Sequence, residues 1–250
     1  MSTIRVAAHV HSDWSYDGSV SLRDLAHAFG RRGYDAVLVA EHDRGFDDQR
    51  WTAHRAACAR ASTSRTVLVP GIEYSDAANA VHVPVWGASR FLGEGRETLA
   101  LLRAARAARG FALLAHPSRR SILETLDPAI LRAVDAIELW NRKYDGYAPS
   151  REAGAVLARQ PGLLPFVSLD FHTARQFHPL AMLLDIEGAP SEASVCRALA
   201  CRRARPKAFG IDARRLADGA AAPAIRGLER GRRHAARPIR ALRGRRAARA

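Results

Sequence analysis

Histidine and carboxylate side chains stand at or near the ends of the apolar segments in this sequence. These residues are His9, His11, Asp17, His42, Glu73, His82, His116, Asp170 and His172. Imidazole nitrogens and carboxylate oxygens, with no cysteine among them, are the donors that zinc, manganese or iron takes in hydrolytic sites. A single tetrahedral ion cannot use so many donors. The sequence therefore predicts a centre that holds two or three divalent metal ions (Mn, Zn or Fe).

The segments that carry these residues alternate between short β-branched runs and Ala/Leu/Arg-rich stretches. We expect strands at 4–10, 36–40, 66–72, 81–86, 111–115, 136–140, 164–169 and 181–186, with helices between most of them. This alternation is typical of βα units around a mostly parallel sheet. In an α/β barrel the C-terminal ends of the strands meet on one face. Ligands scattered along the chain would therefore converge there.

Spacing within two segments supports a shared site. His9 and His11 lie two positions apart, and so do Asp170 and His172. Residues i and i+2 of a strand point to the same side. Each pair can therefore contribute both of its side chains to one centre.

Seven short motifs contain the candidate ligands. They are His9-Val10-His11-Ser12, Asp17-Gly18, Glu41-His42-Asp43, Gly71-Ile72-Glu73, His82, Ala115-His116-Pro117 and Leu169-Asp170-Phe171-His172. In this order they resemble the PHP (polymerase and histidinol phosphatase) family of metal-dependent phosphoesterases. The resemblance implies an α/β fold with a distorted seven-stranded (β/α) barrel. Glu41 and Leu169 stand where Asp and Ser are usual in the family, but neither replaces a ligand.

The resemblance also implies how the ligands are divided among three ions. One ion would take His9, His11, Glu73 and Asp170; a second would take Glu73, His82 and His116; a third would take Asp17, His42 and His172. Glu73 is then the bridging carboxylate. Glu41 and Asp43 are expected to orient histidines, a role that metal sites commonly require.

Clustered divalent ions lower the pKa of a bound water toward about 7 and neutralise charge on a phosphoryl group. We therefore hypothesise metal-dependent hydrolysis of a phosphate ester by a metal-bridging hydroxide, with no protein nucleophile. The substrate would be a small phosphomonoester or phosphodiester, such as a nucleotide. Arg119, Arg142 and Lys143 follow two of the strands. They are the expected substrate contacts, because their side chains donate charge-assisted hydrogen bonds to phosphate.

Three alternatives stay open. A 3′-5′ exonuclease acting on DNA would use the same metal chemistry. An amidohydrolase-type C–N hydrolase also opens with His-x-His, but it often bridges its metals with a carboxylated lysine, and Glu73 fills that place in this sequence. A noncatalytic, metal-stabilised binding module is the third alternative, and the complete ligand set disfavours it.

The basic charge of the chain is concentrated at its C-terminal end. The formal net charge is +14. Residues 1–200 hold 23 basic and 22 acidic side chains, whereas residues 201–250 hold 16 basic and 3 acidic ones. We expect a phosphoesterase domain at 1–205 and an Arg-rich, partly disordered C-terminal tail at 206–250. Such a tail is typical of weak contact with nucleic acid or an anionic membrane.

Two further features bear on the compartment. No apolar run approaches the roughly 18 residues that a transmembrane helix needs, and the start of the sequence has no signal-peptide pattern. Both indicate a cytoplasmic protein. The three cysteines, Cys58, Cys196 and Cys201, form no C-x-x-C pair and support neither a disulfide framework nor a zinc ribbon.

Overall fold

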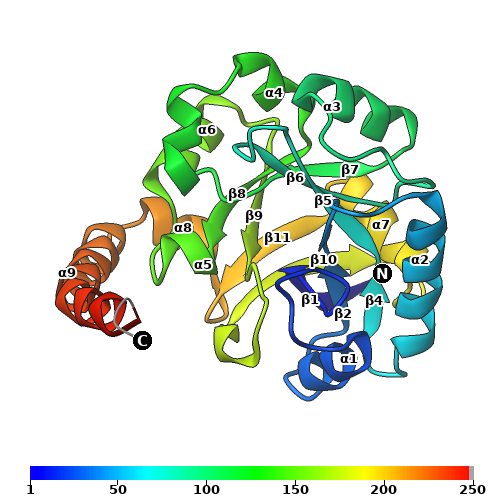
Figure 1. Cartoon of the computed structure of the whole chain (residues 1–250), viewed down its shortest axis with the longest axis horizontal. Coiled ribbons are helices and arrows are strands. Elements are labelled where there is room, and N and C mark those ends of the chain that lie inside the picture. Colours follow the sequence, from blue (N-terminus) through cyan, green and yellow to red (C-terminus); the bar gives the residue numbers. More distant parts are fainter. Residues whose placement is uncertain (248–250) are drawn as a thin grey trace.

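The computed structural model describes residues 1–247, with side chains described up to residue 235. The strands lie at the centre and most helices surround them, while the last helix projects from one side (Figure 1). The predicted α/β fold class is confirmed. Among the described residues, no helix is both long enough and apolar enough to cross a bilayer.

The first sheet contains the N-terminal strand and has six strands. Their order is β12 (Ile211–Asp212), β11 (Ala204–Ala208), β10 (Leu180–Ile186), β1 (Ser2–Val10), β2 (Ala36–Val39) and β4 (Val67–Val69). β1, β2 and β4 are parallel, whereas β10, β11 and β12 pair antiparallel. The expected strand at 181–186 therefore runs against its neighbour β1.

The second sheet also has six strands. Their order is β3 (Glu41–His42), β5 (Gly71–Ser75), β6 (His82–Trp86), β7 (Phe111–Leu114), β8 (Ala136–Asn141) and β9 (Leu164–Ser168). β6 is antiparallel to both β5 and β7, and the other pairs are parallel. His82 therefore enters the site from the first residue of its strand, whereas most other ligands follow the ends of theirs.

The two sheets meet where the chain passes from one to the other. β2 leads into β3 through Ala40, and β4 leads into β5 through Pro70, so the expected strand at 66–72 is divided. Proline has no N–H to donate to a strand ladder, which explains the break. After β9 the chain hydrogen-bonds to β1, with the Leu169 N–H donating to Ala8 O at 3.1 Å and the Phe171 N–H donating to His9 O at 3.1 Å. The predicted seven-stranded barrel is not confirmed, because the strands are divided between two six-stranded sheets.

Helices cover the sheets with apolar faces. Their bounds are α1 (Leu22–Gly30), α2 (Asp48–Ala61), α3 (Thr98–Ala107), α4 (Pro128–Ala133), α5 (Arg142–Asp145), α6 (Arg151–Arg159), α7 (Glu192–Ala200), α8 (Ala213–Asp218) and α9 (Ala222–Ala247), with short 3₁₀ turns at Arg119–Glu124 and Ala174–Gln176. In α1, Leu22, Leu25 and Phe29 are buried, at the i, i+3 and i+7 spacing of one helix face. Ser21 caps its N-terminus by accepting from the Asp24 N–H at 3.1 Å.

Residues 204–218, at the start of the predicted tail, pack against the body of the protein. The expected boundary after residue 205 falls inside β11, which pairs with β10 along its length. Ala208, Ala213 and Ala217 are buried in the main core. These small side chains let α8 approach the sheet closely. Alanine contributes little to the mean hydropathy of a segment, so hydropathy does not predict this packing. The Arg-rich group at 243–246 lies outside the residues whose side chains the structure describes.

Replacing Gly71 by Ala is expected to destabilise the fold. A methyl group at Gly71 would be closer than van der Waals contact to the Trp86 indole, which is fully buried and donates to Val39 O at 2.7 Å. Overpacking of this kind costs about 1–3 kcal/mol. The free energy of unfolding in urea measures the effect. The Gly162→Ala control, where a methyl group meets nothing within 4 Å, should change it by less than about 0.5 kcal/mol. Equal stability of both variants would contradict the packing described for Gly71.

Candidate metal centre

The strand ends bring five imidazoles around one buried carboxylate. Glu73 on β5 is 1% exposed. The facing nitrogens, with their distances to a Glu73 oxygen, are His9 Nε2 at 3.2 Å, His11 Nε2 at 3.5 Å, His42 Nδ1 at 3.1 Å, His82 Nδ1 at 3.0 Å and His116 Nε2 at 3.1 Å. The side chain expected to bridge therefore lies at the centre of the cluster.

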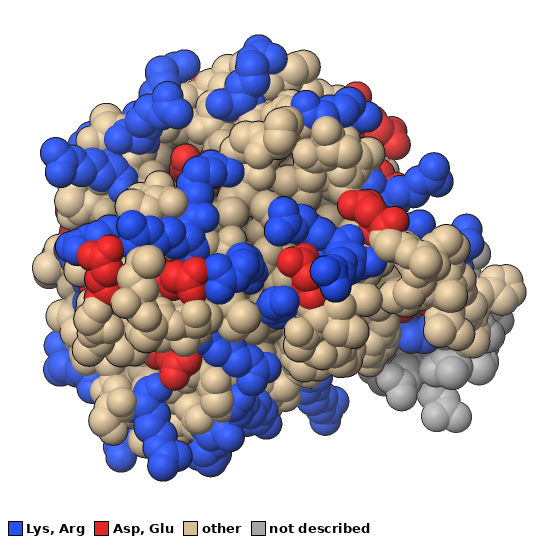
Figure 2. Space-filling model, turned by 180° about the vertical axis from the view of Figure 1, so that it is seen from behind, with Lys and Arg blue, Asp and Glu red and all other residues tan. Residues whose placement is uncertain are grey.

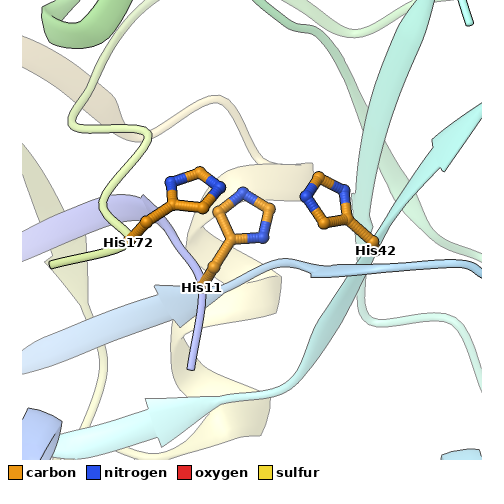
Figure 3. A group of neighbouring side chains, drawn as sticks. All are labelled: His11, His42 and His172. Carbon is orange, nitrogen blue, oxygen red and sulfur yellow. The ribbon is translucent and has the colours of Figure 1, made fainter. Parts of the chain in front are cut away.

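Two further carboxylates complete the cluster. Asp170 is buried, and its Oδ1 lies 3.8 Å from His11 Nε2 and 3.4 Å from His172 Nδ1. Asp17 is partly exposed and lies between two rings, 3.2 Å from His42 Nε2 and 3.1 Å from His172 Nε2. The rings of His11, His42 and His172 come from three separate segments and lie next to one another (Figure 3).

Three groups of donor atoms are close enough to hold an ion. They are His9, His11 and Asp170; His9, Glu73 and His116; and His11, His42 and His172. His82 lies beside the second group, within 3.0 Å of Glu73, and Asp17 lies beside the third, between His42 and His172. The structure thus brings together all nine residues that the sequence singles out. The division into three predicted ligand sets stays a prediction, with His9 and His11 each placed in two groups.

Unpartnered nitrogens show that the cluster suits a cation. The Nε2 atoms of His9 and His11 are buried and have no hydrogen-bond partner, although each faces carboxylate oxygens. Leaving a buried polar atom unsatisfied costs about 1–3 kcal/mol. An ion at the point where these atoms converge would give each of them a partner. Imidazole and carboxylate donors without thiolate suit zinc, manganese or iron.

The backbone is strained at three of the predicted ligands. His9, His116 and Asp170 have φ angles of 58°, 30° and 47°, in the left-handed region that side chains other than glycine rarely adopt. His9 also interrupts the register between β1 and β2, where Ala8 and Val10 take consecutive partners. Such a bulge redirects a side chain. Strain of this kind clusters at functional sites, where it holds side chains in a set orientation.

Glu138 on β8 is a functional residue that the sequence analysis missed. It is fully buried, and one oxygen accepts from His9 Nδ1 at 2.8 Å. The other oxygen accepts from the His116 backbone N–H at 2.5 Å and from Asn141 Nδ2 at 2.7 Å. Because the Nδ1 proton of His9 is committed to Glu138, Nε2 is the atom left for a metal. The signal was present, since Glu138 is the one charged residue in an otherwise apolar strand segment.

Glu41 orients two histidines through a serine. Its carboxylate accepts from Ser12 Oγ and Ser15 Oγ, both at 2.5 Å. Having donated its proton to Glu41, Ser15 Oγ accepts from the His42 N–H at 3.1 Å and from His11 Nδ1 at 3.3 Å. His11 Nε2 is thereby left as an acceptor. Asp43 plays another part, since it accepts from the backbone of Ser75 and Gly95.

The three expected substrate contacts lie in different places. Lys143 Nζ is inside the centre, 3.1 Å from Asp170 Oδ1 and 3.5 Å from His172 Nε2. Arg119 lies at its edge, with Nη1 3.2 Å from His82 Nε2. Arg142 points elsewhere among its described contacts: its guanidinium carbon lies 4.1 Å from the centroid of the Tyr147 ring.

A cavity of about 310 Å³ opens beside the cluster. Its wall includes His42 and His82 from the centre and Tyr16, Arg44 and Asn79 from the surrounding loops. The Tyr16 ring stacks on His42 with 4.8 Å between centroids and is itself largely exposed. The centre is therefore accessible to a small ligand from this side.

Burial and neighbouring charges shift the pKa values of the cluster in opposite directions. Burial lowers the pKa of His11 well below its usual value. Burial also acts to lower the pKa of His9, but Glu73 and Glu138 outweigh it and raise this pKa well above the usual value. For His42, burial is outweighed by Asp17 and Glu73, which raise the pKa to about 10. Glu73 has its pKa held low despite burial, because the surrounding histidines favour the carboxylate.

Comparison with known proteins gives similarity of structure but not of sequence. No protein-family model matches the sequence, and no curated protein matches it. A solved two-domain protein from Bacteroides vulgatus that contains a predicted PHP-like metal-dependent phosphoesterase superimposes with a TM-score of 0.63 at 22% identity, covering 83% of this chain and 65% of that one. The two chains share a fold over this region.

Two other solved structures are similar to this chain in fold. PsfC from Pseudomonas syringae has a TM-score of 0.61 at 18% identity, covering 94% of this chain and 99% of PsfC. The lesion-specific endonuclease PfuEndoQ from Pyrococcus furiosus has a TM-score of 0.52 at 13% identity, covering 80% of this chain and 56% of that one. The chain thus spans PsfC almost entirely, but only part of the Bacteroides protein and of PfuEndoQ.

Replacing Glu138 by Gln should weaken metal binding by about 10- to 100-fold, the usual effect of removing a carboxylate that orients a metal-binding histidine. The amide keeps the size of the side chain but removes the charge that fixes the His9 proton. Titration of the metal-free protein with Zn²⁺ or Mn²⁺ in a calorimeter measures the dissociation constant. Glu124→Gln, at an exposed position of the 3₁₀ turn, is the control. Equal affinities in both variants would remove Glu138 from the metal site.

Metal binding should release protons at pH 7. The raised pKa values of His9 and His42 mean that both rings are protonated in the protein without bound metal, and an ion must displace these protons. Affinity should therefore rise as the pH is raised from 6 toward the His42 pKa of about 10. Calorimetric titration in buffers of different ionisation enthalpy counts the protons. Binding without proton release would contradict protonated His9 and His42 rings in the metal-free protein.

Proposed function

We propose that this protein is a metal-dependent phosphoesterase that hydrolyses small phosphate esters. The observation that carries the proposal is the convergence of five histidines on Glu73, with buried imidazole nitrogens left unpartnered. The fold supports it, because a solved protein that shares this fold is described as containing a predicted PHP-like metal-dependent phosphoesterase.

The three predicted ligand sets would hold the ions. Bound divalent ions supply Lewis acidity toward a phosphoryl oxygen and lower the pKa of a water. The protein supplies the rest through fixed side chains: Glu138 and Ser15 hold the rings of His9 and His11 so that each Nε2 faces the centre. Because these groups are locked by buried hydrogen bonds, no reorganisation is needed when substrate enters.

Lys143 is the side chain best placed to bind the substrate phosphate. It lies 3.1 Å from Asp170 and is about one-third exposed. Burial acts to lower its pKa, but the charge of Asp170 outweighs this and raises the pKa, so the amine is positively charged at pH 7. A phosphoryl oxygen that enters the centre would meet this ammonium group together with the Arg119 guanidinium at the edge. The two cations would hold the substrate in one orientation.

Two of the alternative functions are less well supported. A C–N hydrolase of the amidohydrolase type often bridges its metals with a carboxylated lysine, whereas Glu73 is the expected bridging residue in this chain. Lys143 Nζ contacts Asp170 and His172, whereas the described groups that face Glu73 are histidines, and Lys207 lies on β11. A noncatalytic module would not need Lys143 inside the cluster or a cavity beside it.

Stripping the metal should abolish hydrolysis of phosphate esters, and reloading should restore it. The purified protein would be treated with a chelator, reloaded with Mn²⁺, Zn²⁺ or Fe²⁺, and assayed on an aryl phosphate, sugar phosphates and nucleotides. We expect turnover of at least one ester with at least one ion. If no metal restores hydrolysis of any ester, the proposed function is wrong.

Replacing His9 and His11 by Ala should reduce both bound metal and turnover by more than about a hundredfold, since each removes a direct ligand. Metal content by mass spectrometry and the initial rate on the best ester are the readouts. The control is His27→Ala, an exposed histidine of α1 outside the centre. Undiminished metal content in the double variant would sink the assignment of these ligands.

A further inference from the structure

A second and larger cavity borders the metal centre. It has a volume of about 980 Å³ and lies between the loop after β7, the α5 region, the start of α6 and the C-terminal helix α9. We call it the arginine groove. Its lining residues include Arg119, Arg120, Arg151, Arg226, Arg230 and Arg233, with Asp145, Glu152 and Glu229 as the acidic members. The cavity is thus lined by twice as many basic as acidic side chains.

The acidic members of the arginine groove are fewer than the arginines and neutralise only part of this charge. Glu229 is buried, and Arg232 and Arg233 both donate to its carboxylate at 2.6–2.7 Å. Asp145 is buried under Ser118 and Asn141, and burial raises its pKa to about 7 although both hydrogen bonds oppose the shift. Burial thus favours the uncharged form of the Asp145 side chain. The groove keeps a positive excess.

Several guanidinium groups in the groove have donors to spare. Arg151 and Arg230 are exposed and make no hydrogen bond or ion pair with any residue whose side chain the structure describes. Arg226, Arg230 and Arg233 lie at i, i+4 and i+7 and so share one face of α9. Arg233 Nη2 donates to Tyr144 O at 2.8 Å and holds α9 against the α5 region. The row of arginines is thereby fixed to the body of the protein.

The arginine groove and the metal centre share a wall. Arg119 lines the groove, and its Nη1 lies 3.2 Å from His82 Nε2. Tyr144 also lines the groove, and its ring packs on the His116 ring with 4.7 Å between centroids. A chain of phosphates bound along the arginines would therefore lead to the ions. An aromatic ring at the junction offers a surface for a base to stack on.

The outer surface agrees with an anionic ligand. Of the acidic side chains in residues 1–200, Glu41, Asp43, Glu73, Glu138, Asp145 and Asp170 are buried, whereas no lysine or arginine of that range is. Residues 1–200 carry nearly equal numbers of basic and acidic side chains, but more of the acidic ones are buried, so the surface of this part of the chain is basic. On the face shown in Figure 2, basic side chains are spread widely and acidic ones are fewer.

We propose that the arginine groove binds a single-stranded oligonucleotide, whose phosphates lie along α9 and whose end enters the metal centre. The proposal rests on the proposed function and names its substrate class. The groove is about three times larger than the 310 Å³ cavity beside His42, so it can hold groups beyond one phosphate. A basic groove with an adjacent aromatic ring is the arrangement that binds single strands without sequence preference.

The test replaces two arginines that carry no described structural contact. The full chain with Arg151→Ala and Arg230→Ala would be compared with the natural protein for binding of a fluorescent single-stranded oligonucleotide, by anisotropy at several salt concentrations. We expect about tenfold weaker binding of the variant and a shallower salt dependence, since each lost phosphate contact lowers the slope by about 0.7. Arg159→Ala, exposed at the other end of α6, is the control and should bind as the natural protein does.

Turnover separates this proposal from the proposed function. Hydrolysis of a small aryl phosphate should be unchanged in the double variant, whereas KM for the oligonucleotide should rise about tenfold. Unaltered oligonucleotide binding in the variant would overturn the proposal that the groove binds the oligonucleotide. It would not affect the proposed hydrolysis of small esters. If the double variant binds the oligonucleotide more weakly but the natural protein hydrolyses no ester, the binding groove is supported and the proposed phosphoesterase function is wrong.

Two competitors identify the ligand class. Tripolyphosphate should displace the oligonucleotide only at much higher concentration, because it lacks bases and length. Displacement at equal concentration would show that the groove binds polyanions in general, and it would overturn the proposal that an oligonucleotide is the ligand. Arginine-dependent binding to phosphatidylserine vesicles, with no binding of the oligonucleotide, would overturn it in favour of a membrane surface.

Discussion

Compensation of buried charge is the constraint on which the rest of this structure depends. Glu73, Glu138 and Asp170 are carboxylates with almost no exposure to solvent. Burying an ionised carboxylate without partners is prohibitively costly, so each must face cations or donors. Several strand ends and loops meet at Glu73 because no single element could supply enough imidazoles. The two sheets together position these donors around Glu73.

Local irregularities of the backbone serve the same end. The bulge at His9 and the left-handed conformations of His116 and Asp170 turn side chains inward where a regular strand would not. The break at Pro70 lets one segment belong to both sheets, so Glu73 follows directly on a core strand. Each of these backbone conformations is unfavourable in an unfolded chain. They persist because the surrounding packing holds them.

The sequence predicts which side chains come together better than it predicts the topology of the strands. His9, His11, Glu73, His116, Asp170 and the other candidates stand beside apolar runs, and strand ends must meet on one face, so their convergence could be inferred. The spacing of apolar residues indicates that a segment is a strand but not the direction in which it runs. The antiparallel directions of β6 and β10 were therefore not predicted. Glu138 was overlooked because one acid in an apolar strand resembles a tolerated exception. Its role becomes visible only when His9 lies 2.8 Å away.

The order of the C-terminal region escaped prediction for a related reason. Ala208, Ala213 and Ala217 contribute little to an average hydrophobicity, yet they are buried against larger side chains. The arginines of α9 gain a definite position because Glu229 and Tyr144 tie that helix to the body.

The strained residues give the protein a dependence on its environment. Each residue held in the left-handed region costs of the order of 1–3 kcal/mol, and domain stability is only about 5–15 kcal/mol in total. Ions that bind only the folded chain would add stability, by about 2.7 kcal/mol at a hundredfold excess over the dissociation constant. Folding and metal supply are then linked thermodynamically. In a cell short of the metal, more of the chain would populate unfolded states that proteases degrade, and its abundance would fall with the metal.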